Sequence, residues 1–382
     1  MEVGFVLKKI ISILLIITSF GFTKIYAEDP LKDLSGKSLL LMEADTGTIL
    51  YEKNADEKLP IASVTKIMTM LLIMEAIDSG KITLDEMVTV SERAMSMGGS
   101  TMFLETGEEL SVSDMLKGIA VASANDGAVA MAEHISGSES SFIELMNKRA
   151  KELGMENTNF VNTNGLDDEN HYSTARDVAI MSRELIKHKK IFEYTTIWMD
   201  SLRDGKFQLA NTNKLIRFYN GANGLKTGST SKAMCCLSAT ALRDNMQLIA
   251  VVLAAPTSKE RFAAASGLLD YGFANYSVNK AVEAGEEISK VKVLKGEAEE
   301  VLVATEKEIN ILLKKGEQGE IERKIDIPES LTAPIEKGTV VGKIEFILND
   351  ETIDSVNIIT TQAIAKKGFF AFFSDALKKW VS

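Results

Sequence analysis

The sequence predicts an α/β (α+β) domain with a helical subdomain, followed by a small all-β domain and a C-terminal amphipathic helix. Three observations predict this order. Apolar strand patterns stand on either side of a mostly helical stretch, residues 85–190. After residue 276 the composition changes to short alternating runs rich in Val, Ile, Lys and Glu. The last residues, 362–382, separate aromatic from basic side chains at helical spacing.

The bulk composition excludes several classes of protein. The 382 residues are 45% hydrophobic and 25% charged, a globular balance rather than a disordered or repetitive one. The formal net charge of -11 lacks the basic footprint of a nucleic-acid binder, so we expect no nucleic-acid partner. Three His and two Cys leave little material for a metal centre or a disulfide framework. We therefore expect chemistry that needs neither.

The first element is a predicted signal peptide, residues 1–27. Lys8 and Lys9 precede an apolar run over residues 10–22, and the small Ala27 ends the segment. This is the order of a secretory signal, and the run is short for a membrane-spanning helix. A retained N-terminal anchor is the alternative. The sequence therefore predicts export to the extracytoplasmic side of the cell membrane, in the cell envelope.

The elements of the larger domain, residues 28–279, follow in order. Residues 37–50 have the pattern of two strands joined by a turn at Asp45-Thr46-Gly47. The strongly apolar residues 61–77 indicate a buried helix. Apolar spacing of three and four predicts further helices at 112–119, 127–135 and 140–153. Two buried strands and a helix then follow, at 234–241, 247–253 and 261–275.

The remainder divides into an all-β domain at 280–361 and a C-terminal helix at 362–382. Glycine turns such as Lys295-Gly296 separate the short strands of the former. The latter carries Phe, Leu and Trp on one face and Lys on the other, as in a helix that lies in a membrane interface. The alternative is a core helix that closes the preceding domain. We expect association with the membrane surface.

The first motif that carries chemistry is Ser63-Val64-Thr65-Lys66, at the start of the buried helix. A spacing of three places Ser63 and Lys66 on one helix face, one turn apart. A lysine packed among apolar residues has a lowered pKa and can take the serine proton as a general base. Alone the pattern is weak, because it recurs elsewhere, at Ser229-x-x-Lys232, Ser277-x-x-Lys280 and Ser289-x-x-Lys292.

Two further motifs follow along the chain. Ser123-Ala124-Asn125 lies between helical stretches, where a hydroxyl and a carboxamide can face one cleft; a helix N-cap is the structural alternative. Lys226-Thr227-Gly228 begins a predicted strand. Lys226 offers a fixed positive charge and Thr227 a donor, both suited to a carboxylate, and Gly228 allows an extended ligand to approach. Alone this tripeptide would usually be a turn.

The order of the three motifs is that of active-site serine enzymes acting on D-alanyl peptides and β-lactams. From about residue 30 onward the chain resembles the low-molecular-mass penicillin-binding proteins, the D-alanyl-D-alanine carboxypeptidases. The resemblance extends to Asn164-Gly165-Leu166, residues 171–177, residues 224–228 and Tyr271-Gly272-Phe273. It implies the penicillin-binding/β-lactamase-like transpeptidase fold, the β-rich C-terminal domain and the amphipathic anchor.

The resemblance also implies the reaction and the roles of the site residues. The enzyme would release the terminal D-alanine from peptidoglycan stem pentapeptides and would bind β-lactams covalently. Ser63 would be the acylated nucleophile, Lys66 its general base and Ser123 a proton relay. The residues implied in substrate binding are Asn125, Lys226, Thr227, Gly228, Ser229 and Arg261. Backbone N–H groups of Ser63 and Ser229 would form the oxyanion hole. No metal or organic cofactor is implied.

Two other functions stay open at this point. A β-lactamase would need a deacylating base such as a Glu within residues 155–170, where Glu156 and Glu169 stand outside any recognisable motif. A peptidoglycan-binding scaffold of the same fold would lack turnover. The adjacent Cys235 and Cys236 indicate buried strand residues. The three histidines show no Ser-His-Asp pattern.

Overall fold

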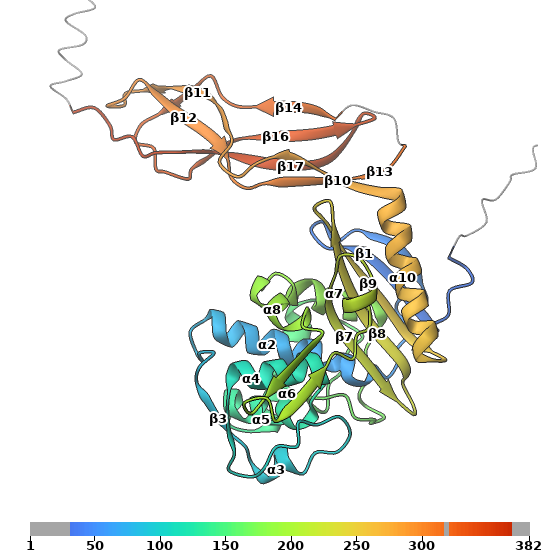
Figure 1. Cartoon of the computed structure of the whole chain (residues 1–382). Helices are drawn as coiled ribbons and strands as arrows, with labels where there is room; N and C mark the ends of the chain where they lie inside the picture. Colours follow the sequence, from blue (N-terminus) through green and yellow to red (C-terminus); the bar gives the residue numbers. More distant parts are fainter. Residues whose placement is uncertain (1–30, 317–320, 369–382) are drawn as a thin grey trace, which may run out of the picture. The chain divides into compact units, whose positions relative to one another are not determined.

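The computed structural model describes residues 31–316 and 321–368 (Figure 1). A five-stranded antiparallel sheet in the order β2-β1-β9-β8-β7 forms the centre of the larger domain. Its strands are β1 (Ser38–Glu43), β2 (Ile49–Lys53), β7 (Ala222–Thr230), β8 (Met234–Arg243) and β9 (Met246–Ala255). Helix α10 (Ser258–Asn275) and helix α7 (Ala175–Leu185) both contact β1, β8 and β9, and Figure 1 shows them on opposite faces of the sheet. Because both faces are covered, β1 is buried at every residue.

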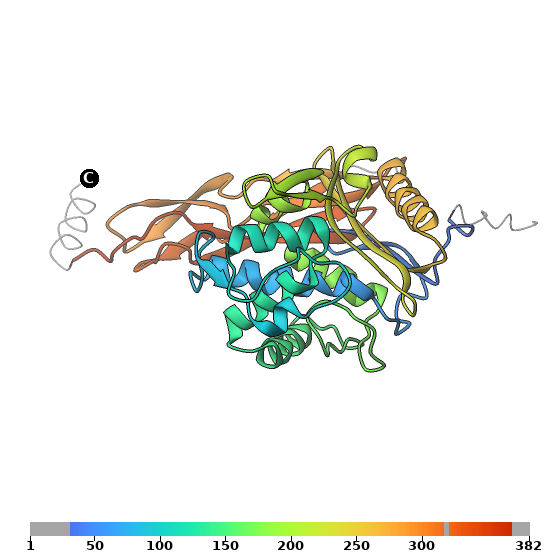
Figure 2. The same ribbon diagram turned by 60° about the horizontal axis from the view of Figure 1, so that its bottom comes forward.

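The helical subdomain surrounds helix α2 (Lys66–Asp78), which contacts α5, α6 and α7 (Figures 1 and 2). Most side chains of α2 are buried, because neighbours pack on several of its faces. A 3₁₀ turn, η1 (Ala62–Thr65), leads into it. The other helices are α3 (Glu92–Met95), α4 (Val112–Lys117), the π-helical turn η2 (Gly118–Ala122), α5 (Asn125–Ser136), α6 (Glu139–Glu152), η3 (Lys189–Ile191), α8 (Phe192–Thr195) and α9 (Leu215–Phe218).

Two small antiparallel hairpins complete this domain. The first pairs β3 (Met87–Thr89) with β4 (Glu109–Ser111), and the second pairs β5 (Met199–Leu202) with β6 (Phe207–Ala210). Strands of three or four residues show too little alternation to be recognised in a sequence. For this reason the sequence missed the strand pair β3–β4. Residues 85–111 belong to the stretch expected to be mostly helical, but α3 is the one short helix that they contain.

The C-terminal part is all-β. Its six-stranded sheet has the order β14-β16-β17-β12-β11-β15, and β10 (Tyr276–Val282) pairs with β13 (Ile309–Lys314). The strands of the larger sheet are β11 (Glu287–Leu294), β12 (Glu300–Thr305), β14 (Glu322–Asp326), β15 (Ser330–Thr332), β16 (Val340–Leu348) and β17 (Glu351–Thr360). Val301, Val303 and Phe346 lie in its own hydrophobic core. The expected boundary near residue 279 falls inside β10, directly after α10.

The strand–turn–strand at 37–50, the buried helix at 61–77 and the strand pair β8–β9 are confirmed. The signal peptide at 1–27 lies outside the described residues, as does most of the C-terminal segment 362–382. Within that segment, Ile364 and Lys366 form β-bridges to Ile335 and Gly296, so its described start is extended rather than helical.

Candidate active site

The predicted nucleophile, Ser63, lies in η1 immediately before α2. It is partly accessible, whereas its neighbours Val64 and Thr65 are fully buried. The preceding Ala62 has a φ of 47°, a left-handed conformation that costs energy for a residue with a side chain. The tight turn presents the hydroxyl at the end of a rigid buried helix.

Lys66 is fully buried, and its Nζ has three partners. Nζ lies 2.9 Å from Ser63 Oγ, 2.6 Å from Asn125 Oδ1 and 2.9 Å from the Asn164 carbonyl oxygen. The orientation of the Asn125 amide is fixed, because its Nδ2 donates to the Gly98 carbonyl at 2.6 Å. Two of the three partners of Nζ can therefore only accept a hydrogen bond.

This geometry suits a neutral amine. A neutral amine has two N–H groups, which match the two obligatory acceptors Asn125 Oδ1 and Asn164 O. The third contact is a donation from Nζ to Ser63 Oγ when the amine carries its third proton; when Lys66 is neutral, the Ser63 hydroxyl can donate to its lone pair instead. Burial, followed by the nearby charge of Lys226, holds the pKa of Lys66 well below its usual range. The arrangement places the Lys66 amine in contact with the Ser63 hydroxyl, as the spacing of the two residues predicts, and so suits the predicted pair of general base and nucleophile.

The Ser123–Asn125 motif forms a sharp turn between η2 and α5. Ser123 is 4% exposed and has φ 65° and ψ 35°, a left-handed conformation that is uncommon for serine. The N-cap of α5 is Ala124, so the helix-cap interpretation of Ser123 is wrong. Asn125 contacts Lys66 as described above, while the relay role of Ser123 stays a prediction.

Asp126, which follows this motif, was not assigned a role from the sequence. Its buried carboxylate accepts hydrogen bonds from the backbone N–H groups of Met102, Leu104 and Gly127, at 2.9 to 3.1 Å. Because Asn125 also bonds the loop through Gly98, the two consecutive side chains fasten residues 98–104 along the edge of the site. In the sequence, the pair Asp126-Gly127 directly after the motif is the one local feature that could have pointed to this role.

Lys226, Thr227 and Gly228 lie inside the edge strand β7 rather than at its start. Lys226 is 1% exposed, and burial together with the nearby Arg261 lowers its pKa to about 7. Burial thus makes the charge of Lys226 more sensitive to pH than that of an exposed lysine, while its role in binding a carboxylate stays a prediction. Thr227 Oγ1 donates to Thr212 Oγ1 at 2.7 Å.

Arg261 reaches the back of the same strand from α10 and is 7% exposed. Its Nη1 donates to the carbonyl oxygens of Gly228, at 3.0 Å, and Cys236, at 3.3 Å. Among the described residues, no carboxylate forms an ion pair with Lys66, Lys226 or Arg261. Lys226 and Arg261, neither of them paired with a carboxylate of the described chain, therefore favour an anionic ligand at this place.

Strand β7 packs directly against the nucleophile turn. A Cβ at Gly228 would lie 2.7 Å from the Ile61 carbonyl oxygen and 2.9 Å from Ser63 N, closer than atoms tolerate. Only glycine allows the strand and Ser63 to approach this closely. Ser229, the next residue, has an exposed side chain, 3.9 Å from Cys235 Sγ. The proposed oxyanion hole, formed by the amides of Ser63 and Ser229, stays a prediction.

Two further residues support the nucleophile without having been assigned a role from sequence. Asn164 accepts from Lys66 through its backbone carbonyl, which no side-chain pattern reveals. His171 Nδ1 accepts from the Val161 amide, so its Nε2–H donates to Thr65 Oγ1 at 2.7 Å. Burial lowers the pKa of His171 to about 4. The neutral His171 therefore fixes the side chain of Thr65, the residue directly before Lys66.

The competing patterns do not reproduce this site. Ser277 and Ser289 lie in strands β10 and β11, where residues three apart point to opposite faces. Glu156 and Glu169 are both exposed. Over residues 31–316 and 321–368, no group of three or more His, Cys, Asp or Glu side chains could hold a metal ion.

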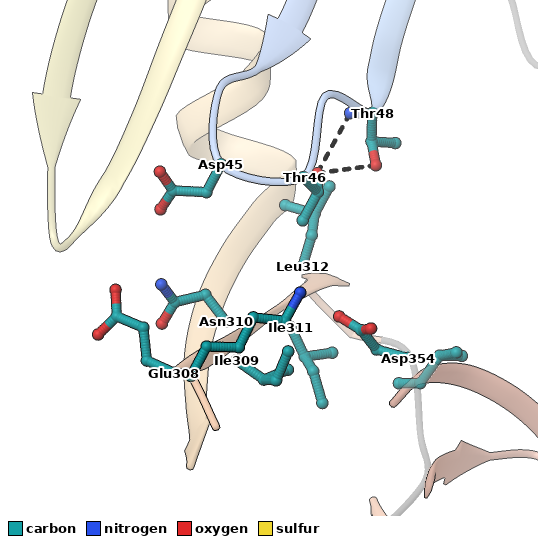
Figure 3. A pocket seen from close by; sticks show the side chains of 11 residues that line it. Asp45, Thr46, Thr48, Glu308, Ile309, Asn310, Ile311, Leu312 and Asp354 are labelled. Carbon is teal, nitrogen blue, oxygen red and sulfur yellow. Dashed lines mark hydrogen bonds between the residues drawn. The ribbon is translucent and has the colours of Figure 1, made fainter. Parts of the chain in front are cut away.

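A cavity of about 670 Å³ lies elsewhere, at the turn between β1 and β2 (Figure 3). Thr46 Oγ1, which accepts from the Thr48 amide at 3.2 Å, belongs to this turn. Residues 307–312 complete most of the lining. None of the predicted catalytic or substrate-binding residues lines this cavity.

Two family models match the sequence. The model described as D-alanyl-D-alanine carboxypeptidase matches residues 23–257. A second, described as the C-terminal domain of penicillin-binding protein 5, matches residues 276–366. The first match ends directly before α10 and the second begins directly after it.

Individual relatives agree with the family models. The D-alanyl-D-alanine carboxypeptidase DacF of Bacillus subtilis is 47% identical over 348 residues, 90% of each chain. DacC of Escherichia coli, with the same description, is 36% identical over 88% of this chain and 86% of its own.

Solved structures share the fold and confirm the expected architecture. Penicillin-binding protein 5 of Haemophilus influenzae matches with a TM-score of 0.75 and 36% identity, over 87% of this chain and 98% of its own. Penicillin-binding protein D2 of Listeria monocytogenes, solved in an ampicillin-bound form, matches with a TM-score of 0.58 and 33% identity, over 63% and 99%. Together with the family models and the relatives, these matches show that the chain belongs to the D-alanyl-D-alanine carboxypeptidase family of penicillin-binding proteins.

Proposed function

We propose that this carboxypeptidase removes the terminal D-alanine from peptidoglycan stem peptides through an acyl-enzyme on Ser63, as a step in peptidoglycan maturation. The observation that carries the proposal is the 2.9 Å contact between Ser63 Oγ and the Nζ of Lys66, whose two other partners can only accept. Lys226 and Thr227, beside Ser63, supply a cation and a hydroxyl for the terminal carboxylate.

The proposed reaction has two steps, acylation of Ser63 and hydrolysis of the acyl-enzyme. In the first, Lys66 takes the hydroxyl proton while Ser63 Oγ attacks the carbonyl carbon of the scissile peptide. The C–N bond breaks, the amine of the departing D-alanine receives a proton through Ser123, and an ester remains on Ser63. In the second, a water molecule gives a proton to Lys66 and attacks the ester carbon. The C–O bond to Ser63 then breaks, Lys66 returns the proton to Ser63 Oγ, and the shortened peptide leaves with a free carboxylate. Backbone N–H groups of Ser63 and Ser229 would stabilise the oxyanion in both steps.

Replacement of the nucleophile tests the assignment. Ser63→Ala should abolish D-alanine release from a muropeptide pentapeptide, because within the described chain the hydroxyl of Ser63 is the one that hydrogen-bonds to Lys66 Nζ. A matched control is Ser277→Ala, which alters the same four-residue pattern in strand β10 and should leave release unchanged. Release retained by Ser63→Ala would refute the assignment.

The same pair of variants tests covalent binding of β-lactams. We expect a fluorescent penicillin to label the wild type and Ser277→Ala but not Ser63→Ala, since the drug would acylate the same hydroxyl. The ampicillin-bound relative from Listeria supports this expectation. Rapid steady hydrolysis of penicillin would instead favour a β-lactamase. Normal labelling without D-alanine release would favour a silent scaffold.

We also propose that the enzyme is exported and held at the extracytoplasmic face of the membrane, where it contributes to cell-wall biogenesis and cell shape. The pattern of residues 1–27 and the separation of aromatic and basic side chains in residues 369–382 support the proposal. Within the described residues, none of the helices has the length and hydrophobicity needed to span a bilayer.

Deletion of residues 369–382 tests the anchor. The cut spares Ile364 and Lys366, whose β-bridges belong to the C-terminal domain. The shortened protein should move from the membrane pellet to the soluble fraction and keep its penicillin labelling. If it still pellets with membranes, the C-terminal anchor is refuted.

A further inference from the structure

A solvent-exposed phenylalanine stands in a conformation that phenylalanine rarely adopts. Phe103 is 73% exposed and has a φ of 54°, in the left-handed region. A bulky residue there is an outlier, and exposure of its ring to water brings no compensating burial. Such strain persists only where the surroundings impose it, and it clusters at functional sites.

The surroundings of Phe103 impose its conformation from both sides. The Asp126 carboxylate accepts the N–H groups of Met102 and Leu104, which flank it. The Arg203 guanidinium donates to the Met102 carbonyl at 2.9 Å and to the Phe103 carbonyl at 3.2 Å. Both flanking side chains are buried, so they anchor the segment while the ring between them stays outside.

The segment is continuous with the catalytic site. The Asn125 backbone N–H donates to the Ser100 carbonyl at 2.7 Å, and its side chain bonds Gly98 and Lys66. The residues that fasten the loop, Asn125 and Asp126, thus belong to or directly follow the second catalytic motif. Phe103 is held three residues beyond Ser100.

A second ring lies beside Phe103. Phe207, at the start of β6, meets it edge to face with ring centroids 6.0 Å apart. Arg203 lies over the Phe207 ring at 5.5 Å and binds Glu108, which fixes this part of the hairpin. The two aromatic rings form a small platform on the loop that Asn125 and Asp126 fasten to the site.

We propose that Phe103 is a specificity-determining residue that binds the part of the peptidoglycan stem beyond its D-alanyl-D-alanine end. This inference rests on the proposed function. The occupant follows from the continuity of the loop with the site: a substrate held by Ser63, Asn125 and Lys226 extends out of the site, and aliphatic or sugar C–H groups pack well on an exposed aromatic ring.

The test compares substrates of increasing length. Phe103→Ala should lower kcat/KM about 10-fold, mainly through KM, for a pentapeptide or a disaccharide pentapeptide. It should leave kcat/KM unchanged for diacetyl-L-lysyl-D-alanyl-D-alanine, and the rate of penicillin labelling should not change. An effect on the free pentapeptide assigns the contact to the peptide; one confined to the disaccharide form assigns it to the sugar.

Two variants separate the ring from the fold of the loop. Phe103→Gly removes the ring and is compatible with a positive φ, so it should behave as Phe103→Ala does. Phe218→Ala is the matched control, because Phe218 is 72% exposed but lies in α9 outside this loop. Equal kcat/KM values on all substrates would overturn the proposal. So would an equal loss on the short substrate together with slower penicillin labelling.

A binding measurement keeps this test separate from that of the proposed function. In the Ser63→Ala background, calorimetry with the disaccharide pentapeptide should show about 10-fold weaker binding when Phe103 is also replaced by Ala. If the wild type releases no D-alanine from any substrate, the proposed reaction fails, and this measurement still decides the role of Phe103. Unchanged affinity would overturn it.

Discussion

Lys66 and Lys226, two lysines with opposite proposed tasks, lie within one site, and burial lowers the pKa of both. For Lys66 the shift is useful, because a general base must be neutral before it accepts a proton. For Lys226 it opposes the task, because binding of a carboxylate needs the cation. A bound carboxylate would raise the pKa of Lys226 again, so substrate binding itself would restore the charge. The two residues are distinguished by their partners rather than by their burial.

The buried His171 makes stability depend on pH. Its pKa of about 4 lies below the usual 6.5, so between these values the unfolded chain binds a proton that the folded chain does not. The free energy of unfolding therefore rises with pH across this window, and the contribution is lost as pH falls toward 4, by about 3 kcal/mol.

Urea unfolding at pH 7 and pH 4.5 measures this effect. His171→Gln cannot titrate but keeps a donor for Thr65, so its stability should fall less between the two pH values than that of the wild type. The wild type and His171→Gln are measured in the same buffers, so other titrating groups contribute equally to both. An identical pH dependence of the two proteins would contradict the prediction.

At the scale of elements, the site depends on how closely a loop approaches the nucleophile turn. Gly165 has a φ of +90°, and a Cβ there would lie 1.8 Å from the Ala62 carbonyl oxygen and 2.9 Å from Ser63 N. Gly165→Ala would therefore push η1 away from the loop. A shift of about 1 Å at a reacting group can cost up to 100-fold in rate, so we expect penicillin acylation to slow at least 10-fold.

The control variant Gly154→Ala separates the steric clash of an added Cβ from the backbone strain of a side chain at positive φ. Gly154 has a similar φ of +77° but no atom within 4 Å of an added Cβ, so it carries the strain without the clash. Its labelling rate should stay near that of the wild type, although its melting temperature falls. Equal labelling rates for Gly165→Ala and Gly154→Ala would show that the close approach is unimportant.

On the scale of the whole molecule, the hydrophobic core around α2 and the core of the C-terminal β domain share no buried residue within the described chain. One core holds Ile67, Leu71 and Val251, and the other Val303, Phe346 and Ile358. A separate core is what a domain needs in order to fold alone, so we expect the larger domain to fold without the C-terminal one. The Listeria relative supports this view, because it matches 63% of this chain with 99% of its own.

A chain of residues 28–275 tests this independence. It ends where α10 ends, before β10 begins, so it cuts no strand. We expect it to melt cooperatively and to be labelled by penicillin at close to the rate of the full-length protein, with Ser63→Ala in the same shortened chain as the blank. A shortened chain that is folded but unlabelled would contradict the prediction.

The sequence by itself determined the order of the major elements and the pair Ser63–Lys66. Apolar period and a spacing of three are local properties, and local geometry brings these two side chains together. It also indicated the other two motifs through their order along the chain. The sequence did not predict three extended segments: the start of β7, the strand pair within residues 85–111, and residues 364–366. Extended segments like these depend on strand partners that no local pattern specifies.

Only the tertiary structure decided which groups surround the reacting atoms. The carbonyl of Asn164, the buried His171 and the carboxylate of Asp126 act across long sequence separations, and no local pattern specifies them. The same holds for the charge of Lys226. The residue type alone indicates a positive charge, but burial makes that charge depend on pH. Residue identity gives the chemistry available, and the packing around it decides the protonation state, the orientation and the partner.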